Sequence, residues 1–189
     1  MFPIICVGGP TGAGKDTILH HFLLHKNDTF VRIPRATTRP KRNGEIDGLH
    51  YNFLTNEAFS DLENKGELCA IDNFCGFKYG INFNHISNEL SQNKRIIGVF
   101  GVCAYRLREI YNNGDVFLIY IRAPIDTLER RLINRGDSDH VIKERITAAK
   151  KQLEEEPGNF DYVILNNNHI DDAVFELEKI IRELESRIL

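Results

Sequence analysis

The sequence predicts a doubly wound α/β fold, in which helices cover both faces of a parallel sheet. Short apolar runs without polar alternation recur along the chain, as expected for strands that are buried on both faces. Stretches with helical periodicity separate these runs. A length of 189 residues and a hydrophobic content of 42% suffice for one domain, so we expect a single domain over residues 1–189.

The expected core elements follow from these two patterns. Strands are expected within residues 1–9 and over residues 30–33, 95–100, 116–121 and 162–165. Helices are expected from Lys15 to about His25 and over residues 125–135, 140–155 and 171–187. Together these elements place the core in residues 1–33 and 86–189.

One region breaks this alternation of strands and helices. Residues 34–84 contain short strand-like pieces, separated by Gly and Asn turns, and one helix near residues 56–65. Insertions of this mixed character in an α/β core often hold a second substrate. We therefore expect a small inserted α+β lobe over residues 34–85.

Composition and charge exclude several classes of function. The net charge is −3 and basic runs are absent, which argues against binding of nucleic acid. The apolar start of the chain is too short for a membrane span and has no basic leader, so neither a membrane segment nor a signal peptide is expected. The four cysteines form no C-x-x-C pair, which favours reduced thiols in a cytoplasmic protein over a zinc site or disulfides.

The stretch VGGPTGAGKDT, residues 7–17, has the G-x-x-x-x-G-K spacing of a phosphate-binding loop. Gly9, Gly12 and Gly14 allow backbone conformations with φ > 0, which turn successive N–H groups toward phosphate oxygens. Lys15 adds a positive charge, and the N-terminus of the following helix attracts the same anion. The residues expected to bind nucleotide phosphates are Gly9, Pro10, Thr11, Gly12, Ala13, Gly14, Lys15, Asp16 and Thr17.

Asp16 stands where such loops carry the Ser or Thr whose hydroxyl binds Mg²⁺. Its carboxylate either stabilises the positive end of the helix dipole or takes over the binding of Mg²⁺. Thr17 follows it and could supply the hydroxyl. Both interpretations stay open, and Asp16 and Thr17 are the candidate metal ligands.

Several motifs together resemble those of guanylate kinases in order and spacing. They are GPTGAGK, TTRPKRNGEIDGLHYNF, GFKYG, ERRLINRG, KERI and FDYVILN. The resemblance covers nearly the whole chain. It implies a P-loop kinase that uses ATP and Mg²⁺, with residues 34–85 as the acceptor-binding lobe and residues 133–145 as a mobile lid.

The resemblance also implies roles for individual residues. Arg39, Arg42, Tyr51 and Tyr79 match the residues that hold the acceptor phosphate. Arg131, Arg135 and Arg145 match catalytic arginines of the lid and hinge, and Asn166 matches the loop that contacts adenine. Arg131 and Arg135 are four residues apart on one predicted helix, so both could face the same cleft.

The chain departs from the family where the guanine base is recognised. Arg35, Ala70 and Ile81 stand where guanylate kinases carry a serine, a glutamate and a second hydroxyl residue. Loss of these polar partners weakens discrimination between bases. Asp72 or Glu67 could substitute for the glutamate.

A second departure lies at residues 98–105, which lack the acidic residue that follows the third core strand in the family. Asp16 could supply this carboxylate on the metal side.

Three functions remain open. The first is an ATP-dependent kinase acting on a phosphorylated small molecule of the GMP type. The second is a ribose 1,5-bisphosphate kinase, because the GKD sequence of the loop and Arg35 resemble that sister group. The third is a catalytically silent binding module with the guanylate kinase fold. Either kinase is expected to be a cytoplasmic monomer or homodimer.

Overall fold

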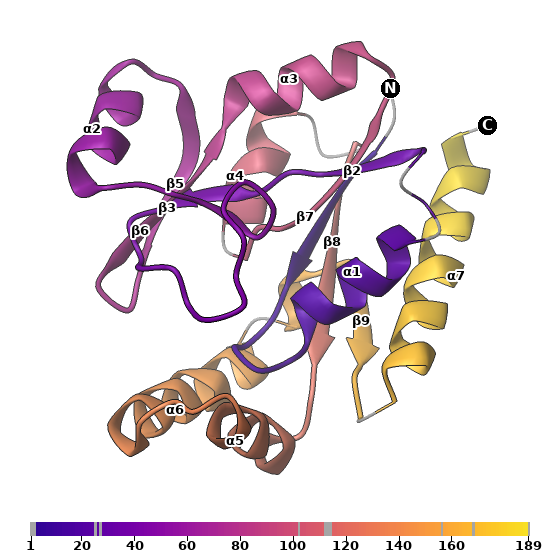
Figure 1. Ribbon diagram of the computed structural model, residues 1–189. Helices are drawn as coiled ribbons and strands as arrows, with labels where there is room; N and C mark the ends of the chain where they lie inside the picture. The colour runs from indigo at the N-terminus through magenta and orange to yellow at the C-terminus, as the bar shows by residue number, and fades with distance from the viewer. Residues whose placement is uncertain are drawn as a thin grey trace. The chain divides into compact units, whose positions relative to one another are not determined.

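The fold alternates strands and helices, as Figure 1 shows. The computed structural model describes residues 3–24, 26, 28–101, 103–111, 115–155, 157–167 and 169–188. By contacts the chain divides into two compact units, Met1–Val7 with Asn27–Phe117 and Gly8–Lys26 with Leu118–Leu189. The parallel strands and their helices confirm the predicted α/β class.

The first unit contains three parallel strands, β1 (Ile4–Gly8, up to Val7), β2 (Phe30–Arg32) and β7 (Arg95–Val99). β7 lies between the other two, with Ile5 opposite Ile97 and Val31 opposite Ile96. β1 is buried along its whole length and β7 is buried from Ile96 to Val99, whereas Val31 and Arg32 of β2 are half-buried. Two helices that the sequence pattern did not predict, α3 (Phe83–Ser91) and α4 (Cys103–Ile110), belong to the same unit.

The first unit also contains a second sheet, with the strand order β4-β3-β6-β5. Its strands are β3 (Arg35–Thr37), β4 (Tyr51–Phe53), β5 (Leu68–Phe74) and β6 (Phe77–Asn82). Helix α2 (Asn56–Asn64) is N-capped by Thr55 and buries Phe59 against Ala36 and Leu68. The short strands predicted for this region and the helix predicted near residues 56–65 are present.

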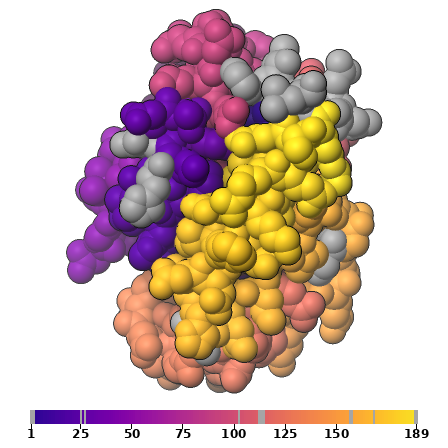
Figure 2. All heavy atoms as spheres, turned by 90° about the vertical axis from the view of Figure 1, so that its right-hand side faces the viewer, coloured from indigo at the N-terminus to yellow at the C-terminus, as the bar shows by residue number. Residues whose placement is uncertain are grey.

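The second unit contains the segment that follows β1, two parallel strands and four α-helices. The strands are β8 (Val116–Arg122, from Leu118 on) and β9 (Tyr162–Leu165), and the helices are α1 (Lys15–Leu24), α5 (Ile125–Asn134), α6 (Asp139–Glu155) and α7 (Ile170–Ile188). A short 3₁₀ turn, η1 (Pro157–Asn159), follows α6. Helix α7 packs on α1 and β9, and its outward side is yellow in Figure 2.

The predicted helix bounds hold to within one residue for α5, α6 and α7. Helix α1 begins at Lys15 as expected and is described to Leu24, whereas His25 lies outside the described residues. Within the described part of the chain, every helix is either too short or too polar to cross a membrane.

Candidate functional site

The glycine loop between β1 and α1 has the backbone conformation that its sequence predicts. The φ angles of Gly9, Gly12 and Gly14 are 122°, 83° and 88°. A Cβ atom at Gly9 would lie 2.1 Å from the carbonyl oxygen of Ile121, and one at Gly14 would lie 2.4 Å from Nδ2 of Asn166. Only glycine fits these two positions, so the backbone keeps the tight curve that a phosphate group requires.

Lys15, the first residue of α1, folds back over the loop. Its Nζ atom donates hydrogen bonds to the carbonyl oxygens of Gly9 at 2.7 Å and Pro10 at 2.8 Å. The N–H of Ala13 donates to the same carbonyl of Pro10 at 3.2 Å. The ammonium group is therefore held inside the ring of the loop, next to the positive end of the α1 dipole. The arrangement concentrates positive charge at the loop.

Asn166, just after β9, ties the loop to the end of that strand. The side chain is 2% exposed and donates from Nδ2 to the carbonyl oxygen of Ala13 at 2.8 Å. Its Oδ1 atom accepts a hydrogen bond from Arg131 at 3.4 Å. Arg131 also donates to the carbonyl oxygen of Gly12 at 3.0 Å. Asn166 and Arg131 thus hold the loop through two of its backbone carbonyl oxygens. The contact of Asn166 with adenine stays a prediction.

The environment of Arg131 is positive. Burial lowers the pKa of this guanidinium, and the neighbouring Arg130 lowers it further. The hydrogen bonds of Arg131 go to a carbonyl oxygen and an amide oxygen, neither of which carries a full negative charge. An anion at this place would therefore be attracted by two arginines and by Lys15 on the same unit.

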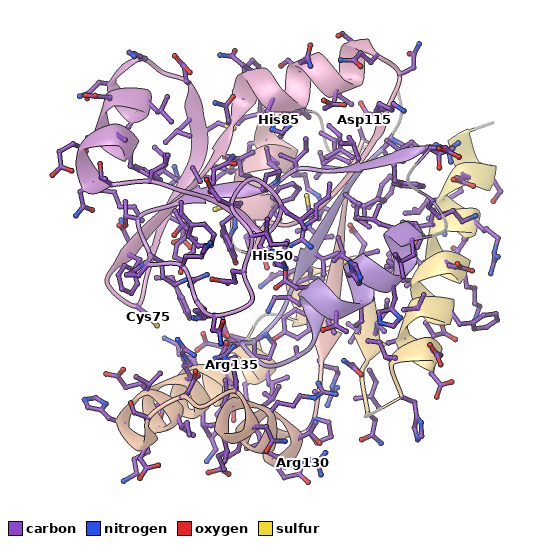
Figure 3. The ribbon with its side chains drawn as sticks, in the orientation of Figure 1. His50, Cys75, His85, Asp115, Arg130 and Arg135 are labelled. Carbon is purple, nitrogen blue, oxygen red and sulfur yellow. The ribbon has the colours of Figure 1, made fainter. Side chains whose placement is uncertain are left out.

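Arg135 and Arg145 share one carboxylate, that of Asp137. Arg135 is the C-cap residue of α5, visible in Figure 3 at the end of that helix, and Arg145 is on α6. Both donate hydrogen bonds to Asp137, which lies between the two helices in sequence. Arg131 and Arg135 therefore bind different partners, although they are four residues apart as predicted.

Asp16 and Thr17 lie in the first turn of α1. Thr17 is exposed and Asp16 is half-buried. The described residues contain no group of three or more His, Cys, Asp or Glu side chains arranged to hold a metal ion. A carboxylate and a hydroxyl next to a phosphate loop nevertheless suit Mg²⁺, which is usually held by one or two protein oxygens together with phosphate oxygens and waters.

The first unit holds the predicted acceptor-binding residues, and two of them are organised by Glu45. Arg39, 6% exposed, donates from both terminal nitrogens to the Glu45 carboxylate, at 2.7 and 3.0 Å. The backbone N–H of Arg42 donates to the same carboxylate at 2.7 Å. Burial alone would raise the pKa of Glu45, but these hydrogen bonds lower it below its usual range. Glu45 thus fixes the relative positions of Arg39 and Arg42.

Arg35 is a buried cation of a different kind. Its guanidinium lies 4.8 Å from the ring centre of Tyr79 and 5.8 Å from that of Tyr51, and it donates to the carbonyl oxygen of Phe100 at 3.2 Å. Its Nε has no hydrogen-bond partner among the described residues. Burial alone would lower the pKa of Arg35, but the nearby Tyr51 and Cys103 raise it above the usual arginine value, which keeps the group charged.

Asp72 faces the same region. It lies opposite Tyr79 in the pairing of β5 with β6, just after a bulge in which Ala70 has a φ of 50°. Burial raises the pKa of the Cys103 thiol, Arg35 lowers it, and the charge of Asp72 raises it again. Arg35, Tyr51, Tyr79 and Asp72 therefore form one cluster, which also includes the thiol of Cys103.

The three residues that differ from the base-recognising residues of guanylate kinases are all buried in the first unit. Arg35 is 9% exposed, Ala70 is 6% exposed and Ile81 is fully buried. Neither Ala70 nor Ile81 has a side-chain polar atom, so Arg35 is the polar group among the three.

The predicted site residues thus form two sets, one in each unit. The donor set comprises the glycine loop with Lys15, Asp16, Thr17, Arg131, Arg135, Arg145 and Asn166; the acceptor set comprises Arg35, Arg39, Arg42, Tyr51, Asp72 and Tyr79. Sequence reasoning missed Asp137 and Glu45. Each lies within six residues of an arginine in one of the motifs that resemble those of guanylate kinases. This closeness in sequence to a candidate arginine could have indicated both acids.

Comparisons with known proteins agree with these motifs. A family model described as "Guanylate kinase" matches residues 1–184. The guanylate kinase of Sphingopyxis alaskensis is 32% identical over 183 residues, which cover 95% of this chain and 81% of the relative. That of Prochlorococcus marinus is 32% identical over 182 residues, which cover 95% of this chain and 96% of the relative.

A solved structure shows the same fold. The crystal structure of guanylate kinase from Anaplasma phagocytophilum superposes with a TM-score of 0.76 and covers 96% of this chain and 85% of that chain. The two sequences are 22% identical, so this likeness concerns the fold.

Proposed function

Since this chain belongs to the guanylate kinase family, we propose that it is an ATP-dependent kinase that transfers the γ-phosphoryl group of ATP to the phosphate of a GMP-type nucleotide, giving GDP from GMP. The observation that carries this proposal is the glycine loop, in which Lys15 is held over the curve and Arg131 and Asn166 support it. A binding module that no longer transfers phosphate has no need of this arrangement.

The donor residues have distinct roles in this proposal. The backbone N–H groups of residues 9–14 and the Lys15 ammonium hold the phosphates of ATP. Asp16 and Thr17 would hold Mg²⁺, which supplies charge neutralisation between the phosphates. Arg131, Arg135 and Arg145 stabilise the charge that develops on the transferred phosphoryl group. Asn166 would contact the adenine.

The acceptor residues bind the second reactant. Arg39 and Arg42 supply guanidinium groups, and Tyr51 and Tyr79 supply phenolic hydroxyls, for the acceptor phosphate. Phosphoryl transfer requires in-line positioning and exclusion of water more than covalent chemistry by the protein. We propose that residues 34–85 act as the acceptor lobe and that residues 133–145 close as a lid.

Arg35 supports a second candidate, a ribose 1,5-bisphosphate kinase that makes the 1-pyrophosphate. A buried guanidinium with no carboxylate partner among the described residues suits an anionic group of the acceptor. A guanine base carries no negative charge, whereas a sugar bisphosphate carries a second phosphate. Arg35 therefore favours a bisphosphate at the position where the family binds the base.

A panel of acceptors tests these proposals. ADP release from ATP and Mg²⁺ is measured with GMP, dGMP, other nucleoside monophosphates and ribose 1,5-bisphosphate. Turnover that is highest with GMP supports the first proposal, and turnover that is highest with the bisphosphate supports the second. No turnover with any acceptor would overturn both and favour a binding module.

Two variants separate the candidates further. Arg42→Ala is expected to weaken acceptor binding in either case, so a normal acceptor affinity in this variant would contradict its role. Arg35→Met is expected to abolish turnover with the bisphosphate alone. For Asp16, an Asp16→Ala protein with an unchanged Mg²⁺ dependence would contradict its place at the metal.

The reaction is proposed to take place in the cytoplasm, by a monomer or homodimer.

A further inference from the structure

Asp137 binds the two arginines of the lid segment at the same time. Its Oδ1 atom accepts a hydrogen bond from Nε of Arg135 at 3.1 Å, and its Oδ2 atom accepts from Nη2 of Arg135 and from Nη1 of Arg145. The side chain of Asp137 is 12% exposed and that of Arg145 is 16% exposed. One half-buried carboxylate therefore joins the end of α5 to the second turn of α6.

The turn that ends α5 fixes the place of Asp137. Gly136 has a φ of 80°, its N–H donates to the carbonyl oxygen of Ile133, and the N–H of Asp137 donates to that of Leu132. This pair of bonds is the Schellman motif, which ends a helix in one defined conformation. The backbone of Asp137 is thus held independently of the arginines that its side chain binds.

The contact leaves part of each guanidinium available. Asp137 uses the Nε and Nη2 edge of Arg135, so the edge formed by Nη1 and Nη2 keeps N–H groups that have no partner among the described residues. Arg145 uses only Nη1, so its Nε and Nη2 edge is likewise available within the described part of the chain. Each arginine can bind a phosphate oxygen while it stays bound to Asp137.

The net charge of the cluster also favours binding of a phosphate group. Two guanidinium groups and one carboxylate leave a net charge of about +1 in the cluster, which still attracts a phosphate. Without the carboxylate, the two cations would repel each other and would lose the bonds that fix their orientation. A long arginine side chain contributes most to the binding free energy when its guanidinium group is oriented before the ligand binds, because less conformational entropy is then lost.

We propose that Asp137 is a positioning residue for phosphoryl transfer, which orients Arg135 and Arg145 toward the transferred group. This role rests on the proposed function, because it concerns the reaction in which these arginines act. It predicts that loss of the carboxylate lowers kcat, since the orientation matters most in the transition state.

The test compares Asp137→Asn with the wild-type protein. The variant keeps the shape of the side chain and removes its charge. With saturating ATP and the best acceptor, kcat is expected to fall by roughly tenfold to a hundredfold, while KM for the acceptor changes by less than about threefold. Asp137→Glu is expected to recover part of the loss. Asp171→Asn, a matched change at an exposed acid in the first turn of α7, is expected to keep kcat within about twofold of the wild type.

A double-mutant cycle with Arg145→Ala shows whether Asp137 acts through the arginine. Single-turnover transfer of radiolabelled phosphate allows slow variants to be measured. If Asp137 positions Arg145, the loss caused by Asp137→Asn is several times smaller in the Arg145→Ala background than in the wild type. Equal losses in both backgrounds would contradict the proposal.

A readout that does not depend on activity completes the test. The Nε–H NMR signal of Arg135 is expected to exchange slowly with water in the wild type and rapidly in Asp137→Asn. Tighter ATP binding with an unchanged or higher kcat in that variant would instead indicate that Asp137 competes with phosphate, and would overturn the proposal. A wild-type protein without transfer activity would overturn the proposed function itself, whereas wild-type activity with an unaffected variant would overturn only the role of Asp137.

Discussion

Asn166 donates a hydrogen bond from its side-chain amide to the carbonyl oxygen of Ala13, at 2.8 Å and across 153 positions of the sequence. The bond joins the end of β9 to the loop before α1. Because Asn166 also accepts a hydrogen bond from Arg131, one buried amide holds both the phosphate loop and an arginine that we assign to catalysis.

Replacement of Asn166 by alanine is therefore expected to lower the free energy of unfolding by about 1 to 3 kcal/mol, because the buried carbonyl of Ala13 loses its partner. Urea denaturation measures this change. Asn167→Ala, at the exposed neighbouring position, is the control and should stay within about 0.5 kcal/mol of the wild type. Equal stability of the two variants would contradict the structural role of Asn166.

Lys15→Ala is expected to lower kcat by about two orders of magnitude or more, because the ammonium group supplies charge where negative charge develops on the phosphates. The melting temperature should change little, since Lys15 and Gly9 are only half-buried and the carbonyl oxygen of Pro10 keeps the hydrogen bond from the N–H of Ala13. Steady-state kinetics and thermal unfolding measure the two quantities. Lys65→Ala, at an exposed position just after α2, should leave both unchanged, and a Lys15→Ala protein of normal kcat would contradict the assignment.

Much of the fold could be predicted because its signals are local. The run before Gly9 is apolar and the glycine spacing after it is specific, so β1, the loop and the start of α1 were predicted together. Helices α3 and α4 were missed for a physical reason. Helix α3 buries one residue fully, Ile86, and α4 has only eight residues, so neither presents a long apolar stripe.

For the site, too, only the features that depend on neighbouring residues could be predicted from the sequence. The phosphate loop is contiguous, so its chemistry is visible in the sequence. The environment of Arg35 is not, because its guanidinium donates to the backbone carbonyl of Phe100 and to the sulfur of Cys103, 65 and 68 positions away. A backbone carbonyl has no sequence signature. The shared contact of Arg135 and Arg145 with Asp137 likewise depends on how the turn after α5 closes.

Replacement by methionine is expected to destabilise the protein more at Arg39 than at Arg35. Arg39→Met leaves the carboxylate of Glu45 without its main partner and should lower the free energy of unfolding by about 1 to 3 kcal/mol. Arg35→Met removes a buried cation that has no carboxylate partner among the described residues, so stability should stay within about 1 kcal/mol of the wild type or rise. Urea denaturation of both variants gives the comparison, and a larger loss for Arg35→Met would contradict it.

The four thiols are expected to react at very different rates. Cys75 is exposed, whereas Cys6 and Cys103 are buried and burial raises the pKa of Cys69 to about 11. At pH 8 only about one in a thousand Cys69 side chains would then be a thiolate. Iodoacetamide should therefore modify Cys75 first, as followed by mass spectrometry of peptides. Cys75→Ser should remove the fast phase, and a fast phase that persists in this variant would contradict the prediction.

Glu45 predicts how stability depends on pH. Burial would raise the pKa of this carboxyl, but the hydrogen bonds from Arg39 and from the backbone of Arg42 lower it below the ordinary range. A lowered folded-state pKa means that the unfolded chain binds the proton more readily, so the stabilisation is complete above the ordinary glutamate pKa and is lost as the pH falls through the lowered value. Between about pH 6 and about pH 3, the free energy of unfolding should fall by roughly 1 kcal/mol more for the wild type than for Glu45→Gln. The difference is no larger because solvent partly screens the ion pair. Denaturation curves at the two pH values measure the difference, with Glu154→Gln at an exposed position of α6 as the control. If Glu45→Gln lost as much stability on acidification as the wild type, the ion pair with Arg39 would not be the source of the dependence.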